Sequence, residues 1–381
     1  MSHEFSRVPT AEIQRSSFDR SHAHKSTIDA GYLYPLLVDE ALPGDTFNLN
    51  ATYFARLNTP IRPVLDNMYL DTFYFAVPLR LVWDNFEKMM GAQDDPGDST
   101  DFTVPMFANS SGVTEGELHD YMGIPPDVPD LEFSALYARS YNLIWRDWFR
   151  DQNLQDSPLI DRDDNPGSQS LYTLLRRGKR HDYFTSALPF PQKGDAVSIS
   201  LGSTAPVDLD GIVGAGGPPT FDVGGSAAKE LSGGSSTTSD ARWDSSVSGA
   251  ASSAVWNDPQ LEGTGVADLS SASTVTINAL RQSFQIQKML ERDARGGTRM
   301  VEINLAHFKV QTPDFRLQRP EYLGGGSTPI KFQPVEANNS NSFDGLDIGD
   351  LAAYAMGIAQ SGFTKSFTEH CIIIGLVNVR A

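Results

Sequence analysis

The sequence has little cysteine, no long apolar run and fewer basic than acidic residues. Its one cysteine among 381 residues is Cys371, which excludes a disulfide framework within the chain and any cysteine-based zinc finger. No run approaches the roughly 18 apolar residues of a membrane helix, so we expect no membrane insertion. The 30 Lys and Arg residues face 48 Asp and Glu, a net charge of −18. That balance argues against a surface covered by nucleic acid but permits a local basic face.

Apolar residues are nevertheless abundant enough to build a large core. Hydrophobic residues make up 40% of the chain and aromatic residues 10%, which excludes wholesale disorder. The length fits two or three domains, or one large all-β domain with insertions. We expect four parts: an N-terminal arm at 1–30, a first folded part at 31–194, an insertion at 195–275 and a continuation of the fold at 276–381.

Periodic patterns predict several strands. Apolar and polar residues alternate at 46–56, which is typical of a half-buried strand. The stretch 68–77 is apolar on both faces and suits a strand packed on both sides, with Pro78 at its end. Further strands are predicted at 300–310 and 371–379. The alanines of 351–359 suit a helix, but its short length between glycines also fits a strand.

Helical spacing occurs at 80–90, at 131–150 and at 277–293, where Gly296-Gly297 would end the helix. Asp130 is the expected N-cap of the second helix. This helix carries a stripe of large aromatic residues at i, i+3 and i+4 spacing: Phe133, Tyr137, Tyr141, Trp145 and Trp148. So large a stripe must pack against a sheet or a neighbouring subunit rather than a cofactor.

The segment 195–275 differs from the rest of the chain. It is rich in Gly, Ser, Ala and Thr and carries ten acidic but two basic residues, which is −8 of the net −18. Such a composition cannot build a dense core of its own, so an exposed insertion is expected. Trp243 and Trp256 are its two tryptophans, and they are expected to anchor the loop or to contact a partner.

Basic residues gather most densely at 176–180. Arg176, Arg177, Lys179 and Arg180 are followed by Tyr183 and Phe184, so the stretch could neutralise phosphates and offer rings to unstacked bases. The alternative is a patch of salt bridges between subunits. The cations of the arm are further candidates for a nucleic-acid-facing side: Arg7, Arg15, Arg20 and Lys25.

The sequence contains no motif that indicates an enzyme or a cofactor site. Glu369 and His370 precede Cys371, but neighbours on a strand point to opposite faces, so a buried unreactive thiol is expected. The stretch 161–167 begins like a calcium loop with Asp161, Asp163 and Asn165. Its sixth position is a proline and its twelfth a tyrosine, so a polar turn is the alternative interpretation.

Longer stretches resemble one family in particular. They include Phe54-Ala-Arg-Leu-Asn-Thr-Pro-Ile-Arg-Pro-Val-Leu-Asp66, Tyr141-Asn-Leu-Ile-Trp-Arg-Asp-Trp-Phe-Arg150 and Phe284-Gln-Ile-Gln-Lys-Met-Leu-Glu-Arg-Asp-Ala-Arg-Gly-Gly-Thr-Arg299. Others lie at 71–78, 179–193, 316–325 and 363–370. Together and in this order, they resemble the major capsid proteins of the microviruses, small single-stranded DNA phages, and within them the gokushovirus branch.

The resemblance implies a mainly β fold, namely a viral jelly-roll β-sandwich with long helical and loop insertions. Family members continue into further strands, so this chain is expected to lack its last strands. The implied function is structural: copies assemble into a T=1 icosahedral shell that encloses single-stranded DNA, with no cofactor. The segment 195–275 would form the surface protrusion that contacts a host receptor. Other virion proteins are expected partners, and assembly is expected in the host cytoplasm.

Within that reading, the aromatic stripe at 131–150 would supply contacts between subunits, as obligate interfaces require. A second hypothesis from another class is a monomeric jelly-roll carbohydrate-binding protein or glycosidase. It would need two carboxylates about 5–9.5 Å apart in a cleft. The acidic residues crowd into Gly- and Pro-rich loops instead, and no spacing selects a pair.

Overall fold

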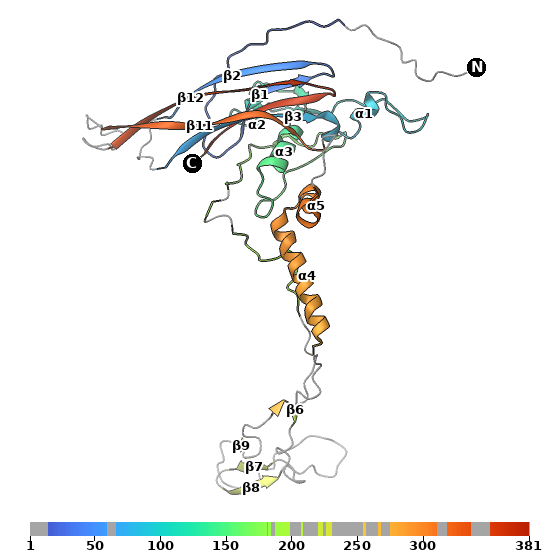
Figure 1. Ribbon diagram of the computed structural model, residues 1–381, viewed down its shortest axis with the longest axis vertical. Coiled ribbons are helices and arrows are strands. Elements are labelled where there is room, and N and C mark those ends of the chain that lie inside the picture. Colours follow the sequence, from blue (N-terminus) through green and yellow to red (C-terminus); the bar gives the residue numbers. More distant parts are fainter. Residues whose placement is uncertain are drawn as a thin grey trace. The chain divides into compact units, whose positions relative to one another are not determined.

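A computed structural model gives the structure of this chain (Figure 1). It describes residues 14–58, 66–180, 182–183, 187–198, 207–208, 220–223, 226–230, 254–256, 266–267, 275–310, 318–336 and 351–380. The chain divides into two compact units. The first combines Met1–Ala187 with Thr312–Ala381, and the second is Leu188–Gln311.

The first unit is built on a six-stranded antiparallel sheet with the order β1-β13-β3-β11-β12-β2. Its strands are β1 (Tyr34–Ala41), β2 (Thr46–Arg56), β3 (Met68–Pro78), β11 (Glu321–Glu336), β12 (Leu351–Ser366) and β13 (Cys371–Arg380). The expected mainly β class is confirmed, and the strands predicted at 46–56, 68–77 and 371–379 are present. The stretch 351–359 is part of a strand.

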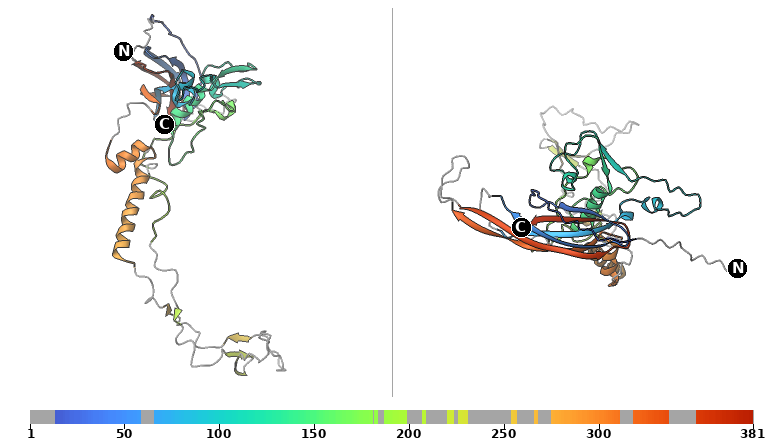
Figure 2. Two further views of the ribbon diagram at one scale, coloured as in Figure 1. Left: turned by 90° about the vertical axis from the view of Figure 1, so that its right-hand side faces the viewer. Right: turned by 90° about the horizontal axis from the view of Figure 1, so that it is seen from above.

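The sheet curls over itself, as the long β11 and β12 show in Figure 2. The first part of β11 pairs with β3 and its last part pairs with β12, which then pairs with β2. This brings β12 across β3, where Thr72 Oγ1 and Ser361 Oγ are 2.9 Å apart and the rings of Tyr74 and Phe363 are 5.4 Å apart. The result is consistent with the β-sandwich that the resemblance implies.

Glycines make this close crossing of strands possible. A Cβ atom at Gly325 would lie 2.1 Å from the carbonyl oxygen of Thr72, and one at Gly362 would lie 2.1 Å from that of Leu49. A third glycine, Gly324, would place a Cβ atom 2.8 Å from the carbonyl oxygen of Gly362. Only residues without a side chain allow the backbones to approach so closely. The same glycines, with Pro329 and Pro334, explain why β11 was not predicted from the sequence.

Two apolar clusters lie on the two faces of the central strands. One fills the space between β3 and β13 on one side and β2 and β12 on the other, and it includes Tyr74, Phe363 and Ile373. The other is larger and lies under α3 (Leu136–Ile144), with Phe75, Trp83 and Tyr141 fully buried. β3 is therefore packed on both faces, as its apolar sequence indicates.

The predicted helix at 131–150 is wrong in its first part. Residues Leu131–Ser134 form β5, which pairs with β4 (Met106–Asn109). Asp130 does not cap a helix: its φ is 56°, and its backbone N–H donates to the carbonyl of Asn109. The strand partner at β4 outweighs the helical spacing of the aromatics. α3 follows, and it continues into a single π-helical turn, η2 (Trp145–Phe149).

Shorter elements connect these parts. The predicted helix at 80–90 is two separate turns, η1 (Leu79–Leu81) and α1 (Phe86–Met89), because the fully buried Trp83 lies between them. The long connection that follows contains α2 (Leu118–Tyr121), and η3 (Gln169–Leu171) comes after η2.

The second unit contains the predicted insertion 195–275 together with two helices. α4 (Ile277–Gly296) confirms the predicted helix and its end, because Gly297 has a φ of 98°. The strand predicted at 300–310 is wrong, since Met300–Phe308 forms α5. Glu302 accepts hydrogen bonds from the backbone N–H groups of Thr298 and Arg299, which starts a helix in spite of the β-branched sequence.

The described residues of this unit also form short strands, namely β6 (Val207–Asp208), β7 (Thr220–Val223), β8 (Ser226–Glu230), β9 (Ala254–Trp256) and β10 (Val266–Ala267). β7 pairs with both β8 and β9, and β6 pairs with β10. The unit therefore begins before the predicted insertion and also includes α4 and α5, which the sequence placed in the continuation of the main fold. Among the described residues, no helix is both long and apolar enough to span a membrane.

Candidate nucleic-acid and subunit interfaces

The basic segment 176–180 is anchored inside the first unit. The backbone N–H of Arg177 donates to the carbonyl of Gly31 (3.0 Å), and that of Gly178 donates to the carbonyl of Phe149 (2.9 Å). A Cβ atom at Gly178 would lie 2.6 Å from the Phe149 oxygen, so this position requires glycine. The segment is thus fixed between the start of the sheet and the end of η2.

Three arginines converge on one buried carboxylate. Asp71 on β3 is 1% exposed, and its Oδ2 atom is 2.6 Å from Arg177 Nη1, 2.7 Å from Arg380 Nε and 3.8 Å from Arg180 Nη2. Burial by itself would raise the pKa of Asp71. Hydrogen bonds from Ser327, Arg177 and Arg380 outweigh it and hold the pKa below its usual value. Asp71 is therefore an anion at neutral pH, and it holds Arg177 and Arg380.

The cations of the segment also contact aromatic rings and a second carboxylate of the same subunit. Arg177 lies over the ring of Phe73, 5.0 Å from its centroid, and its side chain is 12% exposed. Arg176 lies over Tyr32 at 4.8 Å, and Lys179 Nζ is 2.9 Å from Asp182. These ion pairs form within one subunit, so they differ from the salt bridges between subunits that the sequence suggested, and that alternative stays a prediction. Arg177 is too buried to face a nucleic acid, which corrects its assignment.

Two basic residues of the arm also contact groups of the same subunit. Arg15 Nη1 donates to the carbonyl of Gly44, and Arg20 pairs with Asp39 at 2.6 Å. These contacts lay the arm along the turn between β1 and β2. Lys25 is exposed, whereas Arg7 lies outside the described residues.

Three of the five aromatics that were expected between subunits belong to the core of this subunit. Phe133, Tyr141 and Trp145 are 8%, 0% and 5% exposed, and the Tyr141 hydroxyl donates to the carbonyl of Leu33 at 2.8 Å. They have almost no surface left for a neighbour, which corrects that expectation. Tyr137 is half-buried and donates to Glu40.

Trp148 is the member of the stripe with the most exposed surface, at 38%. Its Nε1 donates to the carbonyl of Pro320 (3.0 Å), which fixes the ring. Arg319 lies over the ring at 5.0 Å, and Tyr322, which is 45% exposed, lies 6.1 Å away. Exposed Trp, Tyr and Arg side chains are the types enriched at protein interfaces.

The structure does not describe the side chains of the two tryptophans of the insertion. Trp243 lies outside the described residues. For Trp256 the structure describes the backbone, as the last residue of β9. Their expected role as anchors of the loop stays a prediction.

At the loop 161–165, which resembles a calcium site, the guanidinium group of Arg139 lies where a metal ion would be expected. Arg139 is 2% exposed and donates to the carbonyls of Asp163 and Asn165, both at 2.8 Å. Its Nη2 is 3.7 Å from carboxylate oxygens of Asp161 and Asp163. Within the described ranges, no three His, Cys, Asp or Glu side chains form a group that could hold a metal ion. The polar-turn interpretation therefore fits the structure.

Cys371 is buried beside β3, and burial raises the pKa of its thiol to about 12. A thiol with so high a pKa is not a nucleophile at neutral pH. Glu369 pairs with Arg80 at 2.8 Å, and the His370 ring contacts Phe86. These three consecutive residues therefore have separate structural partners.

Comparisons with known proteins identify the family. The model of a family described as "Capsid protein (F protein)" matches residues 6–381. The chain is 44% identical to capsid protein VP1 of Bdellovibrio phage phiMH2K over 99% of this chain and 71% of the relative. It is 36% identical to capsid protein VP1 of Chlamydia phage 1, over 100% and 73% of the two chains.

The chain belongs to the capsid protein (F protein) family. A third relative, capsid protein VP1 of Spiroplasma virus 4, is 34% identical over 99% of this chain and 71% of its own length. These matches show a structural capsid protein of the gokushovirus-like microviruses, not an enzyme. A capsid protein assembles into a shell of many copies, so part of its exposed surface must contact other copies.

An exposed apolar area lies on the outer face of β2 and β12 in this capsid protein. Phe54 is 67% exposed and Ile358, its partner in the antiparallel register, is 65% exposed. Met356 and Tyr354 follow on the same face of β12 and are 46% and 41% exposed. We call these four residues the outer apolar patch. Sequence reasoning missed it because the period-2 pattern of a strand does not show which of its faces is covered.

Sequence reasoning also missed the carboxylate that organises the arginines. Asp71 stands inside an apolar strand, and Arg380 is the last residue of the apolar β13. A charged residue within a strand that is packed on both faces signals a buried ion pair, because an isolated buried charge is too costly. This signal could identify Asp71, but it could not identify its partners, which are 106 and 309 residues away in sequence.

Proposed function

We propose that this capsid protein forms a T=1 icosahedral shell around a single-stranded DNA genome. In this proposal its insertion contacts a host receptor, other virion proteins associate with the shell, and assembly takes place in the host cytoplasm. The observation that carries the proposal is the outer apolar patch. Large apolar side chains at 41–67% exposure on one strand pair are unusual on a monomer and typical of a surface that another subunit covers.

The relatives support two parts of this proposal, namely that the chain assembles into a shell and that it is part of a virion. Three proteins named capsid protein VP1, each more than 30% identical, align with nearly the whole chain. The genome, the receptor and the geometry of the shell follow from the family resemblance and are part of the proposal.

Electron microscopy of purified protein tests the shell. Wild-type protein should form closed particles of one small diameter, and the double variant Phe54→Ser with Ile358→Ser should remain in small oligomers. Both substitutions remove apolar area from an exposed face without opening the core. A wild-type protein that stays monomeric at every concentration tested would overturn the proposal.

The host-attachment role is tested by deletion of 205–270. The shortened protein should still assemble, because the main sheet and its core lie outside the deleted segment. Particles that carry the deletion should adsorb to host cells less than wild-type particles. Unchanged adsorption would show that the insertion does not contribute to host attachment. Loss of assembly would show that it contributes to contacts between subunits.

The nucleic-acid role of the basic segment is tested with its exposed members. Arg176, Lys179 and Arg180 have side chains that reach solvent, while Arg177 is held by Asp71. Replacing the three by Gln should reduce packaged DNA and leave shells intact. Intact packaging would leave the segment with its structural role alone.

A further inference from the structure

We propose that one face of α4 is a binding site for single-stranded nucleic acid. The inference rests on the proposed genome-enclosing function and gives it a specific site. Arg281, Phe284, Lys288, Arg292 and Arg295 form this site, which we call the α4 basic face. It belongs to the second unit, whereas the segment 176–180, to which the sequence pointed, belongs to the first.

The five residues occupy neighbouring positions around the helix axis. At 3.6 residues per turn they lie within about 80° of one another around the axis, and they extend over about 21 Å. All five are exposed, and the ring of Phe284 is 62% exposed. An aromatic ring therefore stands in a row of four cations.

The carboxylates of the two helices have other partners. Asp293 contacts His307, Glu302 pairs with Arg299 at 3.0 Å, and Glu291 accepts a hydrogen bond from Gln287 at 3.1 Å. Within the described ranges, no carboxylate lies within 4.0 Å of the four cations of the α4 basic face. They thus differ from Arg177, Arg180 and Lys179, whose charges are already met by Asp71 and Asp182.

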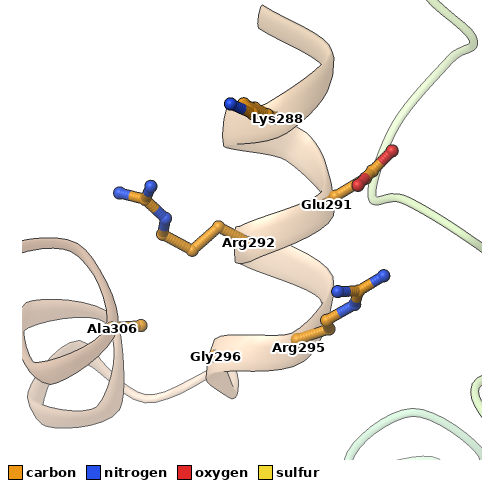
Figure 3. Close-up of a pocket in the computed structure, with 6 residues that line it drawn as sticks. All are labelled: Lys288, Glu291, Arg292, Arg295, Gly296 and Ala306. Carbon is orange, nitrogen blue, oxygen red and sulfur yellow. The ribbon is translucent and has the colours of Figure 1, made fainter. Parts of the chain in front are cut away.

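Three of the four cations border a pocket between α4 and α5 with a volume of about 470 Å³ (Figure 3). Lys288 and Arg292 project toward the side on which Ala306 of α5 lies, and Glu291 and Arg295 project to the other side. The lining thus joins positive side chains to a concave surface next to the exposed ring of Phe284. An anionic group can approach two of the cations at once in this pocket.

Single-stranded nucleic acid matches both features of this face. Its phosphates are regularly spaced anions, and its unstacked bases have flat surfaces that pack on aromatic rings. Lys288 and Arg292 are one turn apart, about 6 Å along the axis, and Arg295 follows after about 4.5 Å. A row of cations at such spacing can contact successive phosphates while Phe284 stacks on a base. In a chain with a net charge of −18, a row of cations without carboxylate partners is otherwise unexplained.

Binding of a fluorescein-labelled 20-nucleotide oligo(dT) to the full chain, measured by anisotropy at several salt concentrations, tests the site. In the variant Lys288→Gln with Arg292→Gln, the salt slope of log affinity should fall by about 1.4, because each lost phosphate contact on a single strand removes about 0.7. The matched control is Lys88→Gln with Arg162→Gln, which removes the same charge from the first unit and should leave the slope unchanged.

A second variant separates stacking from charge. Phe284→Ala should weaken oligo(dT) binding roughly 5- to 100-fold with the salt slope unchanged, and Phe284→Trp should restore it. The substituted residues Phe284, Lys288 and Arg292 are exposed on α4, so the helix should be retained, and circular dichroism checks this. Should the double variant fail to fold, Lys288→Gln alone should lower the slope by about 0.7.

Four results would overturn the inference. Equal slopes for the α4 variant and its control would show that the face does not contact phosphates. Loss of binding in the Arg176, Lys179 and Arg180 variant alone would return the site to that segment. Failure of the α4 variant to assemble, with oligo(dT) binding unchanged, would make the face a contact between copies. Wild-type particles that form but bind no oligo(dT) would refute this site alone, whereas absence of particles would refute the proposed shell.

Discussion

At the scale of single residues, Asp71 shows how a charged side chain is accommodated inside a sandwich. Three arginines from two distant parts of the chain surround it, and two of them also lie over aromatic rings, Arg177 over Phe73 and Arg380 over Tyr69. A buried ion pair of this kind adds little net stability over an apolar pair, but removing one member is costly. Asp71 therefore connects β3, β13 and the segment 176–180 in one arrangement.

The first prediction concerns Asp71 and pH. Asp71→Asn should lower the free energy of unfolding at neutral pH by up to about 3 kcal/mol, because it leaves the partly buried Arg177 and Arg380 without their anion. The folded pKa of Asp71 is lowered, so its contribution is present above the unfolded pKa of about 3.9 and is lost as pH falls through the folded value.

Urea unfolding of both proteins between neutral pH and pH 3 measures this effect. The difference in the free energy of unfolding between wild type and Asp71→Asn should become smaller as the pH falls below about 4. Asp94→Asn, which changes an exposed carboxylate, serves as the control and should leave stability nearly unchanged. A difference that stays constant with pH would contradict the prediction.

The second prediction concerns the loop at 161–165. Calcium should not change the melting temperature of the wild-type protein, because the guanidinium of Arg139 already neutralises Asp161 and Asp163. Differential scanning fluorimetry in calcium and in chelator measures this. A rise in calcium that disappears in Asp161→Ala with Asp163→Ala would show that the loop binds the ion after all.

At the scale of elements, the curl of the sheet depends on glycines rather than on apolar burial alone. β11 and β12 can cross β3 because Gly324, Gly325 and Gly362 leave room for neighbouring carbonyl groups. A sheet without such positions would stay open, and the cluster around Tyr74 and Phe363 would be exposed on that face.

The third prediction tests this crossing. Gly362→Ala should destabilise the protein by at least about 2–3 kcal/mol, because its Cβ atom would overlap the carbonyl of Leu49 and the strands would have to separate. Gly97→Ala is the matched control, since no atom lies within 4 Å of its added Cβ. Urea unfolding compares the two. Similar stability for both variants would mean that the strands can shift to make room.

At the scale of the whole molecule, the outer apolar patch marks a surface that one chain by itself leaves in water. Its four side chains lie on two strands in fixed register, so a partner meets a rigid face. Burial of such a face contributes about 25 cal/mol per Å² of apolar area, before the costs of association. Charge at this place would stop association more effectively than loss of area.

The fourth prediction follows from the patch. Ile358→Glu should abolish shell formation with a change in monomer stability below about 0.5 kcal/mol, since the side chain is exposed in the isolated chain. Analytical ultracentrifugation measures the assembly and urea unfolding the stability. Gln360→Glu, one position further on the same face of β12, tests whether charge alone is responsible and should assemble. Normal shells from Ile358→Glu would place the contacts between copies elsewhere.

Local patterns in the sequence determined the strands at 46–56, 68–77 and 371–379 and the helix ending at Gly296, because period-2 alternation, two-sided apolar burial and a glycine stop act within a few residues. They also carried the family resemblance. The tertiary structure decided the rest. Leu131–Ser134 became a strand because β4 lies beside it, and Met300–Phe308 became a helix through the hydrogen bonds to Glu302. Which cations are neutralised depends on carboxylates such as Asp71 that are distant in sequence. Only the folded chain brings such groups within bonding distance.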